Sequence, residues 1–429
     1  MSKQNPSRET ELVRASLKKR YAREQRFQWY GRIAVMLGFV FLFILLADIV
    51  TKGSPAFTQQ YLKIPVDLSH DALDLGELPN EQELRRGDYS GAIKSSLRDM
   101  FPEVKNRSQK KQLYRLVSIG GEYQLRDAVL ANPSLFGGPV DVWLLAHSEA
   151  ASYLKGQISR DTPEIERRVK DLQMDWLDRL QQEGRTESRF NFLFFTSGDS
   201  REPELAGIRA ALVGSFYTLM VTFLVAFPIG VLAAVYLEEF APRNRLTDLI
   251  EININNLAAV PSIVFGLLGL AVFINFFELP RSAPLVGGIV LSLMTLPTII
   301  ITSRAAIGAV SPSIREASMG IGASKLQTVF HHVLPVAMPG ILTGSIIGMA
   351  QALGESAPLL MIGMVAFIMD VPGGVTDPST VLPVQIFLWA DSPERGFTEK
   401  TSAAIMVLMG FLILMNALAI YLRKRFELK

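Results

Sequence analysis

The sequence predicts an all-α polytopic membrane protein of about six transmembrane helices, with one large polar domain inserted after the first helix. Two observations predict this class. Of the 429 residues, 49% are hydrophobic and only 20% are charged. The apolar residues gather in five or six stretches of about 20 residues, mostly after residue 205, and a helix of that length crosses a hydrocarbon layer of ~30 Å.

Composition excludes several classes of function. The 43 Lys and Arg nearly balance the 41 Asp and Glu, so we expect no nucleic acid partner. With no cysteine, the chain has no disulfide, iron–sulfur cluster or thiol chemistry. Four histidines without a His-Glu-x-x-His pair predict no metal site. No Gly-x-x-x-x-Gly-Lys-Ser/Thr loop is present, so we expect neither a cofactor nor ATP hydrolysis by this chain, which is predicted not to be an enzyme.

Residues 1–32 form a basic tail with nine Lys or Arg against three Glu, which we expect to be disordered and cytoplasmic. Residues 33–52 follow as the first transmembrane helix. A cleavable signal peptide is the rival interpretation, because the uninterrupted apolar run is short. The sequence Leu46-Ala47-Asp48-Ile49 offers no small-x-small cleavage site, which favours an uncleaved helix.

Residues 53–205 form the inserted domain, for which we expect a mainly α or an α+β fold. Its clearest predicted element is an amphipathic helix from Thr162-Pro163 to Gly184. One face of this helix carries residues at spacings of three and four: Ile165, Val169, Leu172, Trp176 and Leu180.

The transmembrane domain, residues 206–425, contains five further apolar spans at about 209–237, 257–277, 285–305, 338–368 and 403–422. Pro358 interrupts the 338–368 span, so it is either a kinked helix or a helix followed by a re-entrant piece. Six crossings and the basic residues at both ends predict that both termini are cytoplasmic and that residues 53–205 lie outside the cytoplasm.

A loop at 313–335 carries signals for two short helices. Two capping boxes mark their starts, Ser313 with Glu316 and Ser324 with Gln327. Gly320 and Gly322 serve the turn between them, and Pro335 is expected to end the second helix. The loop has more apolar side chains than a solvated loop needs: Leu326, Val329, Phe330 and Val333. This excess indicates either a partner with a groove or, as the alternative, a plain re-entry loop.

Several motifs resemble known permeases. Glu316-Ala317-Ser318, Gly322 and Leu334-Pro335 are similar to the EAA-type motif of bacterial ABC-importer permeases, with Ser318 where a second Ala is usual. Residues 228–238, 256–270 and 354–360 resemble the phosphate-specific branch, and the A-type permease most of all. The insertion of about 150 residues departs from the family pattern, and the resemblance implies nothing about its role.

This resemblance implies the type I ABC-importer permease fold in a bacterial cytoplasmic (inner) membrane. It implies four kinds of partner: a second, C-type phosphate permease, two ATPase subunits that carry ATP and Mg, an extracytoplasmic phosphate-binding protein and the lipid bilayer. The ATPase-coupling residues would be Glu316, Ala317, Gly322, Leu326, Phe330, Leu334 and Pro335. The substrate-path candidates would be Glu355, Ser356, Arg304, Pro261 and Ser262.

Two of these predictions have a structural alternative, and one further pattern predicts packing alone. Glu355 lies in an apolar span, where a charge costs at least ~2.5 kcal/mol, so it either serves the substrate or forms a packing ion pair. Pro261 and Gly266 permit either a broken helix or a simple kink. Small residues at every fourth position from Gly340 to Ala352 predict close helix packing.

Two other functions stay open at this point. The cargo could be another oxyanion, such as sulfate or molybdate. Alternatively, the chain could be a membrane sensor or scaffold that uses residues 53–205 to bind a ligand or partner.

Overall fold

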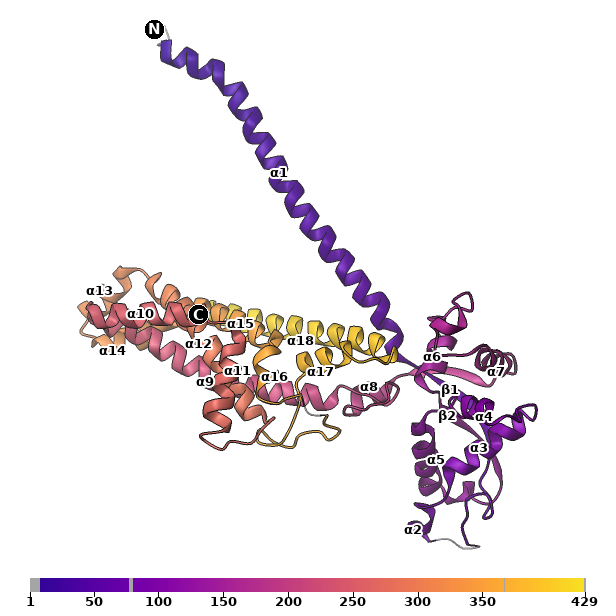
Figure 1. Cartoon of the computed structure of the whole chain (residues 1–429). Helices are drawn as coiled ribbons and strands as arrows, with labels where there is room; N and C mark the ends of the chain where they lie inside the picture. Colours follow the sequence, from indigo (N-terminus) through magenta and orange to yellow (C-terminus); the bar gives the residue numbers. More distant parts are fainter. Residues whose placement is uncertain (1–7, 77–79, 366, 428–429) are drawn as a thin grey trace. The chain divides into compact units, whose positions relative to one another are not determined.

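The computed structural model describes residues 8–76, 80–365 and 367–427 and divides the chain into two compact units, residues 1–52 and 53–429. Helix α1, Arg8–Gly53, forms the described part of the first unit and ends one residue beyond it (Figure 1). It contains the predicted first span within a candidate membrane helix at Arg20–Phe57. The expectation of a disordered basic tail is wrong from Arg8 onward, and residues 1–7 lie outside the described part. No proline interrupts residues 8–53 and good helix formers fill the tail, so the membrane helix extends toward the N-terminus.

The inserted domain is built on a three-stranded antiparallel sheet with the order β2-β1-β3. The strands are β1 Thr58–Asp67, β2 Pro139–Leu145 and β3 Thr186–Phe190. Leu62 pairs with Leu144 on one side and with Thr186 on the other. Alternate residues of β1 (Leu62, Ile64 and Val66) are fully buried, as expected for a strand with one face on a core.

Short helices surround this sheet. They are α2 Glu81–Leu84, α3 Tyr89–Met100, α4 Arg107–Tyr114, α5 Ile119–Ala131, α6 Ser148–Leu154, α7 Asp171–Gln182 and α8 Phe192–Thr196, with 3₁₀ turns η1 Ser54–Phe57, η2 Pro133–Leu135 and η3 Glu164–Glu166. The core includes Leu97, Trp176 and Leu177. The inserted domain is therefore α+β, the second of the two predicted alternatives.

The helix predicted from Thr162 begins too early. Glu164–Glu166 is a 3₁₀ turn, Ile165 is 91% exposed and α7 begins only at Asp171. The buried Arg167 explains the difference, because its guanidinium donates to the Thr162 carbonyl oxygen and holds the preceding segment in a turn. The predicted end at Gly184 is confirmed by its left-handed backbone, with φ at 67°.

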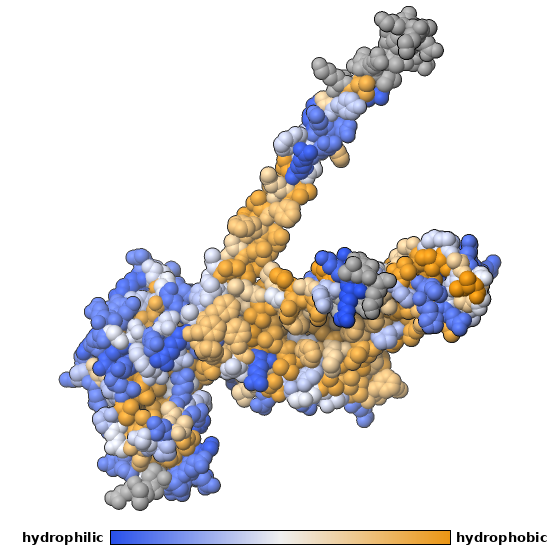
Figure 2. All heavy atoms as spheres, turned by 180° about the vertical axis from the view of Figure 1, so that it is seen from behind, coloured by the Kyte–Doolittle hydropathy of each residue, from blue (hydrophilic) through white to orange (hydrophobic). Residues whose placement is uncertain are grey.

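The remaining helices form the membrane bundle. They are α9 Arg209–Val235, η4 Tyr236–Phe240, α10 Arg245–Ala258, α11 Ser262–Leu268, η5 Gly269–Ile274, α12 Pro284–Gly308, α13 Pro312–Gly320, α14 Lys325–Thr328, η6 Val329–Val333, α15 Leu334–Gly354, α16 Ala357–Met361, α17 Leu382–Ala390 and α18 Gly396–Glu427. Of these, η4, η5 and η6 are π-helical. Among the described residues of the whole chain, five helices are long and apolar enough to cross a membrane, and the bent pair α10–α11 makes six. Figure 2 shows hydrophobic residues over this bundle and hydrophilic residues over the inserted domain.

Helix α12 packs against both α9 and α15. The contact with α15 depends on the predicted small-residue stripe, because a Cβ atom at Gly344 would overlap the Thr302 side chain and one at Gly340 would lie 2.7 Å from the Ala306 Cβ. The stripe therefore serves packing inside the bundle, as expected.

The 338–368 span is corrected at both ends. Helix α15 continues directly from α14 and η6, so the span covers Lys325–Gly354. Glu355 then adopts an extended backbone with ψ at 119°, and the short helix α16 follows. A helix followed by a separate short piece is thus the correct alternative.

Candidate coupling surface and translocation path

Helix α13 is fastened to the bundle through Arg315. Its guanidinium pairs with the Glu239 carboxylate at 2.7 Å and donates to the carbonyl oxygens of Ile307 and Val310 at 2.9 and 2.6 Å. Glu239 belongs to η4, at the end of α9, and its side chain is only 8% exposed. One arginine therefore joins α13 to the ends of α9 and α12.

Helices α13 and α14 are also held to each other. The hydroxyl oxygens of Ser318 and Thr328 lie 3.0 Å apart in a buried position. The turn passes through Gly322, whose φ of 93° suits glycine. The predicted capping box of Ser324 and Gln327 is confirmed, with reciprocal hydrogen bonds of 2.9 and 3.2 Å.

Apolar side chains remain exposed on this pair of helices and at the turn between them. Met319 is 50% exposed, Ile321 83%, Leu326 59% and Phe330 42%. Among the other predicted coupling residues, Glu316, Ala317, Gly322 and Pro335 are exposed and Leu334 is half-buried. We refer to the exposed residues of α13, α14 and their turn, together with Phe330, as the α13–α14 surface.

Three predictions about this loop are wrong. Ser313 and Glu316 form no capping box, because Ser311 is the N-cap and Pro312, preorganised for the first helical turn, starts α13 earlier. Pro335 does not end the second helix, since it lies in the first turn of α15, where its missing N–H is tolerated. Val329 and Val333 are buried in the bundle core and do not add to the exposed apolar surface.

Two of the membrane helices are broken, and the short helices that follow the breaks contact each other. Pro261 is the N-cap of α11 and Ser262 its first residue, and the chain bends by 103° between α10 and α11. The break is therefore complete and not a simple kink. On the other side, Ser356 is the N-cap of α16. A Cβ atom at Gly266 would lie 2.7 Å from the Pro358 Cα, so α11 and α16 are in direct contact.

Glu355 lies at the second break and is half-buried. Its backbone N–H donates to the Ala352 carbonyl oxygen at 3.3 Å. Within the described part of the chain its carboxylate has no hydrogen-bond or ion-pair partner, so the predicted packing ion pair does not form there. The carboxylate is thus available to another subunit or to a substrate.

Arg304 lies elsewhere on α12. Its guanidinium pairs with Glu251 of α10 at 2.8 Å and with Glu238 of η4 at 3.4 Å. Helix α15 runs antiparallel to α12, with Gly340 beside Ala306 and Gly348 facing Thr295. Glu355 therefore lies beyond the level of Thr295, and a rise of 1.5 Å per residue separates that level from Arg304 by about 14 Å. The structure places Arg304 near the α13–α14 surface and away from the breaks.

Sequence reasoning missed the anchoring role of Glu238, Glu239 and Arg315. A signal was available, because a pair of acidic residues at the end of a membrane span is unusual where basic residues are expected. Arginines on two other segments supply the compensating charge.

Parts of this chain are similar to known proteins. The model of a family described as binding-protein-dependent transport system inner membrane component matches residues 226–428, and a domain of unknown function, DUF3333, matches residues 14–164. An inward-facing structure of the MetNI methionine ABC transporter matches with a TM-score of 0.40 and 18% identity, covering 51% of this chain and 94% of that chain.

Curated relatives match between about a third and about half of this chain. The phosphate transport system permease protein PstA 2 of Mycobacterium bovis is 32% identical over 214 residues, which are 49% of this chain and 69% of that protein. PstA of Haemophilus influenzae is 28% identical over 52% of this chain and 77% of its own length. The probable ABC transporter permease protein YqgI of Bacillus subtilis is 37% identical over 40% of this chain. The chain spans 58% of YqgI and 52% of the related YqgH.

Proposed function

Because this chain belongs to the family of binding-protein-dependent transport system inner membrane components, we propose that it is one of the two transmembrane permease subunits of an ATP-driven ABC importer of inorganic phosphate. Members of this family are permease subunits, which are transport components and not enzymes.

The observation that carries the phosphate assignment is the similarity to PstA proteins over about half of the chain, at 32% identity for the Mycobacterium bovis protein. The Bacillus subtilis permeases match with higher identity over a shorter region, and their names specify no cargo. Transport of another oxyanion is therefore the alternative, and competition in the uptake experiment distinguishes it from phosphate transport.

The proposed partners are those that the family implies, and an exposed surface supports one of them. The α13–α14 surface would bind one of two ATPase subunits, which hold ATP and Mg, because its apolar side chains are exposed although its base is fixed. A C-type permease would complete the path beside the helix breaks, and an extracytoplasmic binding protein would deliver phosphate. The subunit would have both termini in the cytoplasm and residues 53–205 outside the cytoplasmic membrane.

The side chains at the two helix breaks are suited to binding phosphate, which supports this function. The unpaired carboxylate of Glu355 can accept a hydrogen bond from protonated phosphate, which sulfate at neutral pH cannot donate. Ser356 and Ser262 lie at the starts of the two short helices, which contact each other, and their hydroxyl groups could donate to the anion. Arg304 remains a candidate only for the part of the path near the α13–α14 surface.

The test is uptake of radiolabelled phosphate by phosphate-starved cells that lack this chain, with and without its re-expression. Uptake that returns with the chain and resists excess unlabelled sulfate or molybdate is the expected result. Competition by either anion would reassign the cargo. Equal uptake in both strains, with the protein present in the membrane, would overturn the phosphate function.

A further inference from the structure

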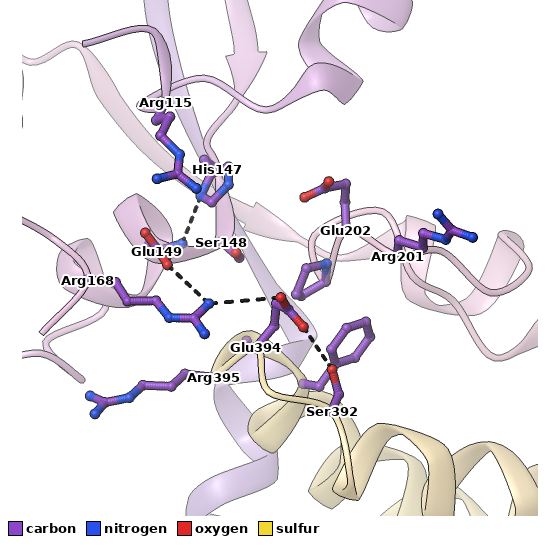
Figure 3. A pocket seen from close by; sticks show the side chains of 13 residues that line it. Arg115, His147, Ser148, Glu149, Arg168, Arg201, Glu202, Ser392, Glu394 and Arg395 are labelled. Atoms are coloured by element: carbon purple, nitrogen blue, oxygen red, sulfur yellow. Dashed lines mark hydrogen bonds and ion pairs between the residues drawn. The ribbon is translucent and has the colours of Figure 1, made fainter. Parts of the chain in front are cut away.

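A polar cavity of about 420 Å³ lies between the inserted domain and the loop that leads into α18 (Figure 3). Charged side chains from both sides line it, among them Arg115, His147, Arg168, Glu202 and Glu394. Arg168 already pairs with Glu149 and Glu394, at 3.6 and 3.9 Å. The transport function proposed above does not use this cavity.

Two potential metal ligands, His147 and Glu202, line this cavity, and a third, Glu204, lies beside them. His147 is the N-cap of α6, just after strand β2, whereas Glu202 and Glu204 belong to the segment between α8 and α9. One imidazole nitrogen and one oxygen of each carboxylate all lie within 4.8 Å of one another. Figure 3 shows the Glu202 carboxylate turned toward the His147 ring.

Glu204 supplies an independent sign that a ligand belongs here. Its side chain is buried, with the residue only 6% exposed, and its Oε2 accepts a hydrogen bond from the Ser148 N–H at 3.2 Å. Its Oε1 is buried with no hydrogen-bond partner in the part of the chain that the structure describes. A buried carboxylate oxygen without a partner costs more free energy than an unsatisfied neutral group does. A bound cation would remove this penalty.

The buried Lys400 acts on Glu204 only through its charge. Its ammonium donates to the Ala206 carbonyl oxygen at 2.8 Å and lies over the Phe194 ring, 5.1 Å from the ring centroid. It forms no hydrogen bond or ion pair with Glu204 among the described contacts.

The His147 ring is suitably placed for coordination. The Glu149 N–H donates to its Nδ1 at 3.3 Å, which is long for such a bond, so little is lost when the ring proton moves to Nδ1. That shift leaves the Nε2 lone pair free for a metal. Imidazole with carboxylates is a ligand set that zinc accepts, at bond lengths of about 2.0–2.2 Å, whereas calcium and magnesium prefer oxygen alone.

We propose that His147, Glu202 and Glu204 bind one divalent transition-metal ion, with Zn²⁺ as the best-suited ion. Small side-chain rotations bring the three ligand atoms to bonding distance, and water from the cavity completes a tetrahedral shell. The ion ties the end of strand β2 to the segment that enters membrane helix α9.

Zinc binding to the untagged full-length chain tests this proposal. The protein is purified in detergent, treated with a chelator and titrated with ZnCl₂ by calorimetry, with the thermal midpoint recorded in parallel. We expect one site and a rise in the midpoint. Glu204→Gln and His147→Ala should each weaken binding by about tenfold or more and lose the rise.

Two control variants separate this site from other zinc binding. Glu149→Gln changes a carboxylate that lines the same cavity but lies outside the cluster, and it should bind as the wild type does. The double variant His331→Ala with His332→Ala should also retain the site. No binding by the wild type, or equal binding by Glu204→Gln, would overturn the proposal. If a ligand variant does not fold, X-ray absorption of the wild-type zinc complex decides, because a shell without an imidazole nitrogen contradicts the assignment.

Discussion

Gly322 controls the turn of the α13–α14 surface through its backbone. Its φ of 93° disfavours any side chain, although a Cβ atom would meet no other atom within 4 Å. Gly322→Ala should therefore strain the turn by about 1–2 kcal/mol, and Gly322→Pro should abolish uptake while the protein stays in the membrane. Phosphate uptake and membrane content are measured together.

Gly320 provides the matched control. It is the last residue of α13, has no left-handed φ and also has open space around its Cβ position. Gly320→Ala should leave uptake unchanged or slightly stabilise the helix. Normal transport by Gly322→Pro would contradict the coupling role of this loop.

The buried carboxyl group of Asp199 should make the free energy of unfolding depend on pH. Burial raises the pKa of its carboxyl, although the Trp389 Nε1–H donates to its Oδ1 at 2.9 Å and opposes the shift. A raised native pKa means that the folded chain binds the proton more tightly than the unfolded chain. The resulting stabilisation is complete below the unfolded pKa of about 3.9 and is lost as the pH rises through the native value.

Asp199→Asn keeps an acceptor for Trp389 and removes the charge. Relative to the wild type, its thermal midpoint should therefore rise as the pH increases from about 4 to 7. Asp391→Asn, at an exposed acidic residue, should not show this trend. A constant difference between Asp199→Asn and the wild type across this range would refute the prediction.

At the scale of elements, one ion pair joins the inserted domain to helix α18. The Lys155 ammonium lies 2.8 Å from the Glu399 Oε1 and also donates to the Pro55 carbonyl oxygen at 2.8 Å. The two side chains are only 8% and 14% exposed. Lys155→Ala would leave a buried carboxylate without its cation, at a cost of about 3–5 kcal/mol.

We therefore expect Lys155→Ala to accelerate proteolysis of the inserted domain in the purified chain. Lys63→Ala breaks an exposed pair with Asp141, whose side chains are 36% and 45% exposed, and should change the rate little. Equal rates in the two variants would argue against a structural role for the Lys155 pair.

Some elements could be predicted from the sequence because their signals are local. Hydropathy summed over about 20 residues located the membrane helices, and the Ser324–Gln327 box marked the start of α14 correctly. The start of α13 was misplaced because Pro312 competes with the Ser313 signal. Pro358 indicated that the 338–368 span is interrupted, but it did not locate the end of α15 at Gly354.

At the scale of the whole molecule, the chain without cysteine allows a direct test of topology. Lys94→Cys and Ile321→Cys each place one thiol at an exposed position, the first in the inserted domain and the second beside Gly322. A membrane-impermeant maleimide should label Lys94→Cys in intact spheroplasts. It should label Ile321→Cys only after lysis. Labelling of both before lysis, or the reverse pattern, would contradict the proposed orientation.

Long-range associations limited prediction at this scale. The strands of the sheet begin at Thr58, Pro139 and Thr186, and only the fold brings them together. The cluster of His147, Glu202 and Glu204 has the same origin, which is why residue spacing predicted no metal site. Arg304 and Glu355 were both predicted to lie along the substrate path. The structure places them at different levels of the antiparallel helices α12 and α15.

The π-helical turn at Val329–Val333 has a mechanical consequence. A π turn holds one residue more than an α turn, and in an α-helix one residue corresponds to about 100° of rotation and 1.5 Å of advance. If the extra residue shifts along the helix, the segment that bears Leu326 rotates about the helix axis relative to α15. A displacement of the 313–335 loop can thus be coupled to a rotation of the helix inside the bundle.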